Sequence, residues 1–175
     1  MTLFEILVIV VSLGVLLLLQ KNDKNAWKKY IITAIAVLLF EYFTQALWLN
    51  NNLAKWSYLY LDVNWVLTLG WTAIILVSVV FVDYTFKSAS DKKRYVFYII
   101  TASIIGFFGE VLVTSMGIRE YSSATQALIS GVEVFGSVPI EAIYYIPVFM
   151  ALVIAFKKYW EVNLVENNKA SRRKK

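Results

Sequence analysis

Five apolar stretches, each long enough to cross a lipid bilayer, constrain this chain more than any other feature. They lie at about residues 2–20, 29–50, 63–86, 95–117 and 137–156 of the 175. An α-helix rises about 1.5 Å per residue, so about 20 residues cross a hydrocarbon core about 30 Å thick. Hydrophobic residues make up 59% of the sequence, which is too many for a soluble fold of this size. We therefore expect an all-α, multi-pass protein of the cell membrane with five transmembrane helices.

The positions of the basic residues predict the orientation of these helices. All but two of the 17 lysines and arginines fall on one side of a five-span arrangement, the exceptions being Lys55 and Arg119. This positive-inside pattern places the N-terminus outside and the C-terminus in the cytoplasm. We assign residues 1–158 to a single transmembrane domain and residues 159–175 to a basic cytoplasmic tail near anionic lipid, and we expect no nucleic-acid partner. The first span lacks a basic n-region and a cleavage site, so we expect a retained helix.

The residue types that are missing exclude several kinds of chemistry. Cysteine and histidine are both absent, which removes disulfides, thiol nucleophiles, imidazole bases and the usual zinc and haem ligands. No lysine lies in the middle of a span, so a retinal-type Schiff base is not expected. The sequence also lacks the Asp-rich motif with which prenyl transferases hold a magnesium diphosphate. We expect neither a cofactor nor a metal.

A weak internal repeat organises the last four spans. Residues 63–87 align without gaps on residues 132–156, and the same offset of 69 positions relates Glu41 to Glu110. Spans two and three would then recur as spans four and five in the same orientation, giving units at about 29–87 and 95–156. Such parallel repeats are related by an axis along the membrane normal, and a site is expected in the cleft between them.

Three glutamates inside the apolar stretches are the candidate site. An ionisable group in hydrocarbon costs about 2.5 to 3.5 kcal/mol, so it is retained where it is paired, neutralised or hydrated. Glu110 lies 16 residues from Arg94, and Glu141 lies 16 residues from Lys157, which places both at one depth, about 24 Å from the basic edge. The repeat places Glu41 in the same layer. We expect all three acids to face one cavity.

Glu141 has two interpretations that the sequence leaves open. With Ser137 as N-cap and Pro139 in the first helical turn, its carboxylate would complement the positive end of a helix and have a lowered pKa. Alternatively, burial and a like-charged neighbour would keep it protonated, as an acid catalyst requires. Pro147 leaves the carbonyl of Ile143 without its helical partner and is expected to bend the helix where a pocket can form.

Aromatic residues crowd the outer boundary between spans two and three, where Trp56 and Tyr58 lie. They also have two interpretations. They form the interfacial belt of a membrane protein, or they form a π-rich wall that stabilises a carbocation by about 0.5 to 2 kcal/mol per ring.

These features resemble the small membrane lycopene cyclase domain of heterodimeric and fused carotenoid cyclases. The resemblance is specific over "GFFGEVLVTSMGIREYSSATQALISGVEVFGSVPIEAIYY", residues 106–145, and extends weakly over residues 29–156. Glu110 matches the helix acid of the family, "MGIREYS" its loop with Arg119 in place of a tryptophan, and "PIEA" its acidic motif. Ala142 replaces the second motif glutamate. In the first unit, Glu41 and "LAKWSY" match, but "LGWTAII" stands where the motif belongs, with Thr72 opposite Glu141.

The resemblance implies a redox-neutral cyclase or isomerase of an isoprenoid or lipid substrate, in a divergent member. Glu141 would protonate a C=C bond, and Glu110 or Glu41 would recover the proton. We expect the cation to fold against five aromatic residues: Trp56, Tyr58, Trp71, Tyr144 and Tyr145. The expected partners are the lipid bilayer and an apolar isoprenoid or lipid ligand, and the family's subunit organisation makes homo- or hetero-oligomers an open question. Two alternatives remain: a membrane protein that binds an apolar ligand or carries a proton-coupled solute, and a structural subunit.

Overall fold

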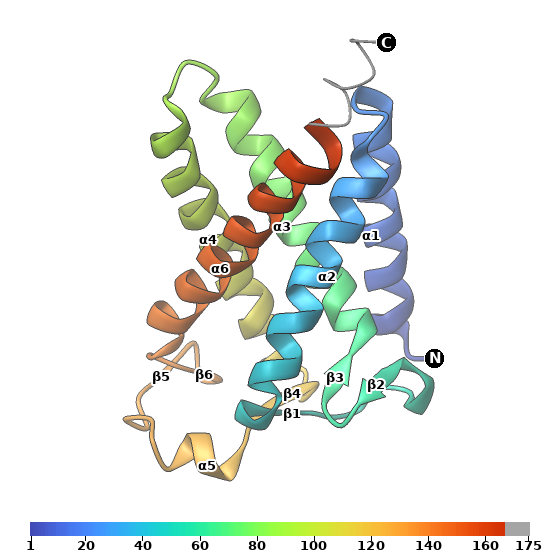
Figure 1. Ribbon diagram of the computed structural model, residues 1–175. Helices are drawn as coiled ribbons and strands as arrows, with labels where there is room; N and C mark the ends of the chain where they lie inside the picture. Colours follow the sequence, from blue (N-terminus) through green and yellow to red (C-terminus); the bar gives the residue numbers. More distant parts are fainter. Residues whose placement is uncertain (167–175) are drawn as a thin grey trace, which may run out of the picture.

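The structure is a computed structural model that describes residues 1–166, and five long helices account for most of it (Figure 1). Each is long and apolar enough to span a membrane, as the sequence predicted. The expected tail from residue 159 begins inside the last helix and continues as a π-helix, η3 (Val162–Glu166), while residues 167–175 lie outside the described residues. The five helices are α1 (Leu3–Asn22), α2 (Ala26–Thr44), α3 (Trp65–Thr85), α4 (Asp91–Ser115) and α6 (Ala142–Glu161).

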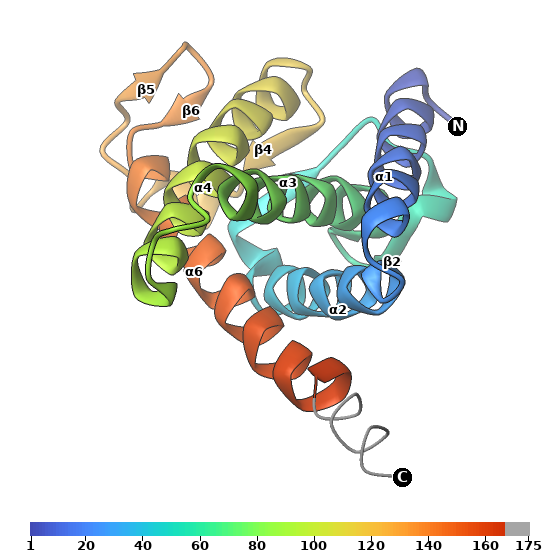
Figure 2. The ribbon, with the colours of Figure 1, turned by 90° about the horizontal axis from the view of Figure 1, so that it is seen from above.

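Four of these helices form a ring in which α2 packs against α3, α3 against α4, α4 against α6, and α6 against α2. Helix α1 lies outside this ring, against α3 and α2 (Figure 2). The core consists of apolar side chains that face the inside of the ring, including the fully buried Val37, Ile75, Ala142 and Ile154. Most exposed positions of the helices are also apolar, as a helix in contact with lipid requires.

Gly106 allows α4 to approach α3 and α6 closely. A Cβ atom at this position would lie 2.6 Å from Cε of Met150 and 2.9 Å from the Trp71 ring. Small residues at helix contacts let backbones approach each other in membrane proteins. The glycine therefore sets the spacing of three helices around the middle of the bundle.

Short elements cap the end of the bundle at which α1 begins (Figure 1). The α2–α3 loop contains η1 (Gln45–Leu47), β1 (Trp48–Asn50), η2 (Lys55–Ser57), β2 (Tyr58–Tyr60) and β3 (Val63–Asn64). The α4–α6 loop contains β4 (Arg119–Tyr121), α5 (Ser123–Gln126), β5 (Glu133–Val134) and β6 (Val138–Pro139). All three strand pairs are antiparallel: β2 with β3, β5 with β6, and β1 with β4. The β1–β4 pair joins the two loops to each other.

Two span boundaries predicted from hydrophobicity are wrong by several residues. The second span was expected to continue to residue 50, but α2 ends at Thr44 because residues 48–50 pair with β4. The fifth was expected to begin at residue 137, but α6 begins at Ala142 because Val138 and Pro139 pair with β5. Pro139 is therefore in a strand rather than in the first helical turn.

Polar contacts also tie the helices together at the opposite end of the bundle. Tyr98 of α4 donates a hydrogen bond to Asp83 of α3. Lys157, expected at the basic membrane edge, is buried and forms an ion pair of 2.7 Å with Glu161 one turn further along α6. The Tyr98–Asp83 contact joins α3 to α4 on the side away from the strand pairs, and the Lys157–Glu161 pair lies within α6.

Candidate functional site

A cavity of about 440 Å³ lies between α2 and α6, beneath the loops that carry β1 and β4. Its lining is largely apolar. Helices α2 and α6 supply half of the lining residues, α3 contributes Trp71, α4 contributes Glu110, and the loops close the end that carries the strand pairs. Three aromatic rings of the lining pack against one another. The ring centroid of Phe149 lies 5.4 Å from that of Trp71 and 4.7 Å from that of Phe40.

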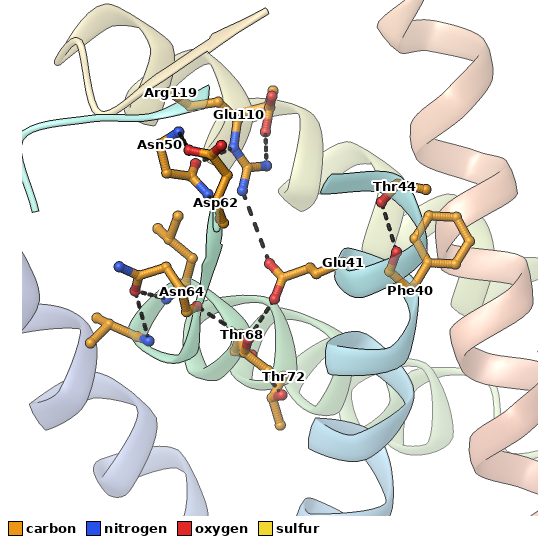
Figure 3. Close-up of polar contacts among 12 residues, drawn as sticks. Phe40, Glu41, Thr44, Asn50, Asp62, Asn64, Thr68, Thr72, Glu110 and Arg119 are labelled. Carbon is orange, nitrogen blue, oxygen red and sulfur yellow. Dashed lines mark hydrogen bonds and ion pairs between the residues drawn. The ribbon is translucent and has the colours of Figure 1, made fainter. Parts of the chain in front are cut away.

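A buried arginine lies between two buried glutamates in the wall of this cavity (Figure 3). Nη1 of Arg119 is 3.1 Å from Oε2 of Glu110, and Nη2 is 4.0 Å from Oε1 of Glu41. The three residues are 3%, 1% and 4% exposed. Nε of Arg119 donates a hydrogen bond of 3.1 Å to Oδ1 of Asn50, and the guanidinium lies 4.8 Å from the Trp48 ring centroid. These contacts hold the arginine through Nη1, through Nε and through the face of the guanidinium.

The two glutamates differ in how completely they are hydrogen-bonded. Glu110 accepts from Arg119 through Oε2, and through Oε1 from the hydroxyls of Tyr121 at 3.1 Å and Tyr145 at 3.5 Å. Glu41 accepts from the Thr68 hydroxyl through Oε2. Within the described residues, Oε1 of Glu41 accepts no hydrogen bond and Nη2 of Arg119 donates none. Both carboxyl oxygens of Glu110 are thus hydrogen-bonded, whereas Glu41 keeps one oxygen without a hydrogen bond.

The charge state of the loop residues in the cluster follows from these contacts. Burial opposes the charged form of Arg119, but the neighbouring carboxylates of Glu110 and Glu41 outweigh it and raise the arginine pKa. Burial, followed by the Glu110 charge, raises the pKa of Tyr121. Arg119 therefore remains a cation, and Tyr121 remains a neutral hydrogen-bond donor.

Glu141 lines the same cavity from the N-cap position of α6, but its side chain makes no capping hydrogen bond to that helix. Its Oε1 accepts a hydrogen bond of 2.8 Å from the backbone N–H of Ser130, which lowers the pKa of the carboxyl. Oε2 is shielded from solvent and has no partner among the described residues. Of the two interpretations, the ionised form is the one these contacts favour, although its partner is a loop amide and not the helix end.

The structure brings the three predicted acids, Glu41, Glu110 and Glu141, to one cavity. The predicted aromatic contacts divide into two groups. Trp71, Tyr144 and Tyr145 line the cavity.

Trp56 and Tyr58 lie outside the lining, in the α2–α3 loop. The ring of Trp56 packs at 5.1 Å against Trp65, and the Tyr58 hydroxyl donates to the Asn50 carbonyl at 2.5 Å. Both side chains thus stabilise the loop. Within residues 1–166, no group of three or more acidic side chains comes together in a way that could hold a metal ion.

Sequence reasoning missed the residue at the centre of the cluster. Arg119 was noted as an exception to the charge pattern and as a departure from the tryptophan of the cyclase loop, but not as a partner of the acids. A signal was present, since a lone arginine on the outer side, near acids in apolar helices, is a natural partner for them. Thr68 and Asn50 gave no such signal, because the Thr68 contact depends on how α3 packs against α2 and the Asn50 contact depends on loop geometry.

Comparison of the chain with protein-family models, with curated proteins and with solved structures finds no match.

Proposed function

We propose that this protein is a membrane-embedded, redox-neutral cyclase or isomerase whose isoprenoid-like substrate binds in the cavity between α2 and α6. The observation that carries the proposal is an apolar cavity with three carboxyl groups in its lining. Leu47, Tyr144 and Val148 line it and are also exposed on the surface of the bundle. An opening between two transmembrane helices lets an apolar substrate enter directly from lipid.

Charge and hydrogen bonding suggest a role for each acid. Arg119 and the fully partnered Glu110 neutralise each other, so a protonated Glu41 leaves the buried cluster without net charge. We assign Glu41 as the proton donor to a C=C bond. Glu141, whose pKa is lowered, is the base that removes a proton from the resulting cation. These roles reverse those expected from the sequence, because Glu141 is held by an N–H donor that favours its anion.

The rings around the cavity suit a cationic intermediate. Trp71, Tyr145 and Phe149 present aromatic surface to the cavity, and each ring stabilises a nearby cation by about 0.5 to 2 kcal/mol. Water is scarce at such a wall, so the cation is shielded from capture until a proton leaves or a ring closes.

We further infer that the N-terminus lies outside and the C-terminus in the cytoplasm, and that the helix pair α2–α3 is repeated as α4–α6, as the sequence predicts. The loops with the strand pairs lie at the end opposite the basic turn between α3 and α4, which supports an outer location for the cavity.

Exchanging α2 with α4 and α3 with α6 preserves the packing around the ring, which supports a two-fold relation. The helix starts differ, since residue 65 of α3 corresponds by the 69-residue offset to position 134, eight residues before α6 begins.

A second candidate function is binding of an apolar ligand without turnover. The complete hydrogen bonding of Glu110 and the Ser130–Glu141 contact favour it, because both acids have structural partners. A measurement of turnover distinguishes the two candidates, because only the enzyme changes the bound ligand chemically.

The test is deuterium uptake from D₂O into isoprenoids incubated with the protein in lipid vesicles. A protonation followed by deprotonation exchanges carbon-bound hydrogen, so mass spectrometry of the recovered lipid detects turnover. We expect uptake with the unaltered protein, loss of it in Glu41→Gln, and normal uptake in Glu133→Gln, which changes an exposed loop carboxylate. If the protein binds the isoprenoid but neither the unaltered protein nor the variants incorporate deuterium into it, the enzymatic proposal is overturned in favour of binding.

A further inference from the structure

We propose that the ligand of the cavity carries a hydroxyl group at one end, as an allylic isoprenoid alcohol does, and that this hydroxyl lies between Arg119 and Glu41. The inference rests on the proposed function, since it takes the same cavity as the substrate site. It adds the chemical class of the substrate, and for this class Glu41 protonates the hydroxyl oxygen in place of a C=C bond. Carbon-bound hydrogen is then exchanged by reversal of the deprotonation at Glu141, so the deuterium test applies to this route as well.

Two polar atoms in the cavity wall form an ion pair of 4.0 Å with each other but no hydrogen bond, and one of them, Nη2 of Arg119, is buried. Nη2 of Arg119 has no acceptor, and Oε1 of Glu41, 4.0 Å away, has no donor within the described residues. Figure 3 shows the two groups pointing toward each other from β4 and α2. The remaining nitrogens of the guanidinium are occupied by Glu110 and Asn50. An unpaired buried donor costs about 1 to 3 kcal/mol, so a ligand atom that bonds to it gains affinity there.

The spacing selects a single small oxygen group. An oxygen about 2.8 Å from both atoms fits a separation of 4.0 Å. A hydroxyl both accepts and donates, so it can accept from Nη2 and bond to Glu41 in either protonation state. A carboxylate or phosphate would face two glutamates across one arginine, and a pure hydrocarbon would leave Nη2 unpaired.

The position of the hydroxyl suggests how the reaction begins. The proton of Glu41 passes to the hydroxyl oxygen, the C–O bond breaks with its electron pair on oxygen, and water leaves. An allylic cation remains among the rings of Trp71 and Phe149. Glu141 then takes a proton from a carbon next to the cation, before or after ring closure. The substrate loses one water overall, with no oxidation or reduction.

Binding is the first test. Farnesol and the matched hydrocarbon, in which hydrogen replaces the hydroxyl, are titrated into the protein in detergent while tryptophan fluorescence is followed, because Trp48 and Trp71 line the cavity. We expect the alcohol to bind roughly tenfold more tightly. Glu41→Gln should reduce this preference, because it alters one of the two groups that contact the hydroxyl, whereas Glu133→Gln should retain it.

Oxygen exchange is the second test and needs no cyclised product. In water enriched in ¹⁸O, reversible loss of the hydroxyl labels the recovered farnesol, and Glu41→Gln should abolish the labelling. Equal affinity for alcohol and hydrocarbon, with deuterium uptake into the hydrocarbon, overturns this inference and leaves the proposed function intact. If neither compound binds, both proposals fail. Tight alcohol binding without ¹⁸O exchange overturns the reaction step.

Discussion

Asn50 and Arg119 face each other across the β1–β4 strand pair, and Nε of Arg119 donates a hydrogen bond of 3.1 Å to Oδ1 of Asn50. The two residues are 69 positions apart in the chain, the same separation as Glu41 and Glu110. The contact ties the loop that follows α2 to the loop that follows α4. The guanidinium is thereby fixed between two carboxyl groups that belong to different helices.

Removing Arg119 should destabilise the protein strongly. In Arg119→Ala, Glu110 loses its ion pair of 3.1 Å while it remains buried, and breaking a buried pair in this way costs about 3 to 5 kcal/mol. The measurement is the free energy of unfolding in detergent, by titration with a denaturant. Arg94→Ala is the control, because its partners Asp91 and Asp83 are 91% and 45% exposed and such surface pairs contribute about 0 to 1 kcal/mol. Similar losses in both variants would contradict a buried cluster.

Close packing at Gly106 predicts a second stability difference. Gly106→Ala places a methyl group 2.6 Å from Met150 and 2.9 Å from the Trp71 ring, and overpacking of this kind costs about 1 to 3 kcal/mol. Gly14→Ala in α1 is the matched control, since nothing lies within 4 Å of the added atom and alanine is the better helix former. We expect Gly14→Ala to be neutral or stabilising in the same unfolding assay. A neutral Gly106→Ala would show that the helices can move apart.

The existence of the five helices could be predicted because the cost of exposing backbone to lipid allows few other structures. Their number and type follow from apolar stretches about 20 residues long. Hydrophobicity does not specify which outer residues pair as strands, so Trp48 and Val138 were expected inside helices. The β1–β4 pairing determines where α2 ends, and the β5–β6 pairing determines where α6 begins.

Depth along a helix could be predicted from the sequence, and it brought three acids to one cavity. Rotation and partner choice could not be predicted. Glu110 was expected beside other acids, but its neighbour is Arg119, which reaches it through a strand pair formed by residues distant in the chain. Likewise, Asp83 of α3 contacts Tyr98 and Arg94 of α4 rather than a residue near it in the chain. Tertiary packing chose these partners over the nearest ones in sequence.

Orientation in the membrane can be tested with two single cysteines, because the chain has none. Asn51→Cys lies in the α2–α3 loop and Ser90→Cys in the turn between α3 and α4, at opposite ends of the bundle. We expect an impermeant thiol reagent to label Asn51→Cys on intact cells and Ser90→Cys only after the cells are opened. Labelling of both from the same face would be incompatible with the five-span arrangement.

The hydrogen bond between Ser130 and Glu141 predicts a pH dependence. The Ser130 N–H lowers the pKa of Glu141 from its ordinary value of 4.5, so the stability gained from this contact is fully present above that pH. It is lost as the pH falls through the lowered pKa, because the protonated acid is the weaker acceptor. We expect hydrogen exchange at the Ser130 amide to be slow, relative to its intrinsic rate, above pH 4.5 and to lose that protection below it. Glu141→Gln, a neutral acceptor, should show weaker protection with no such transition. Because the same ionised carboxylate is the proposed base, turnover should fall over the same acidic range; an activity that rises there would assign Glu141 as the proton donor instead.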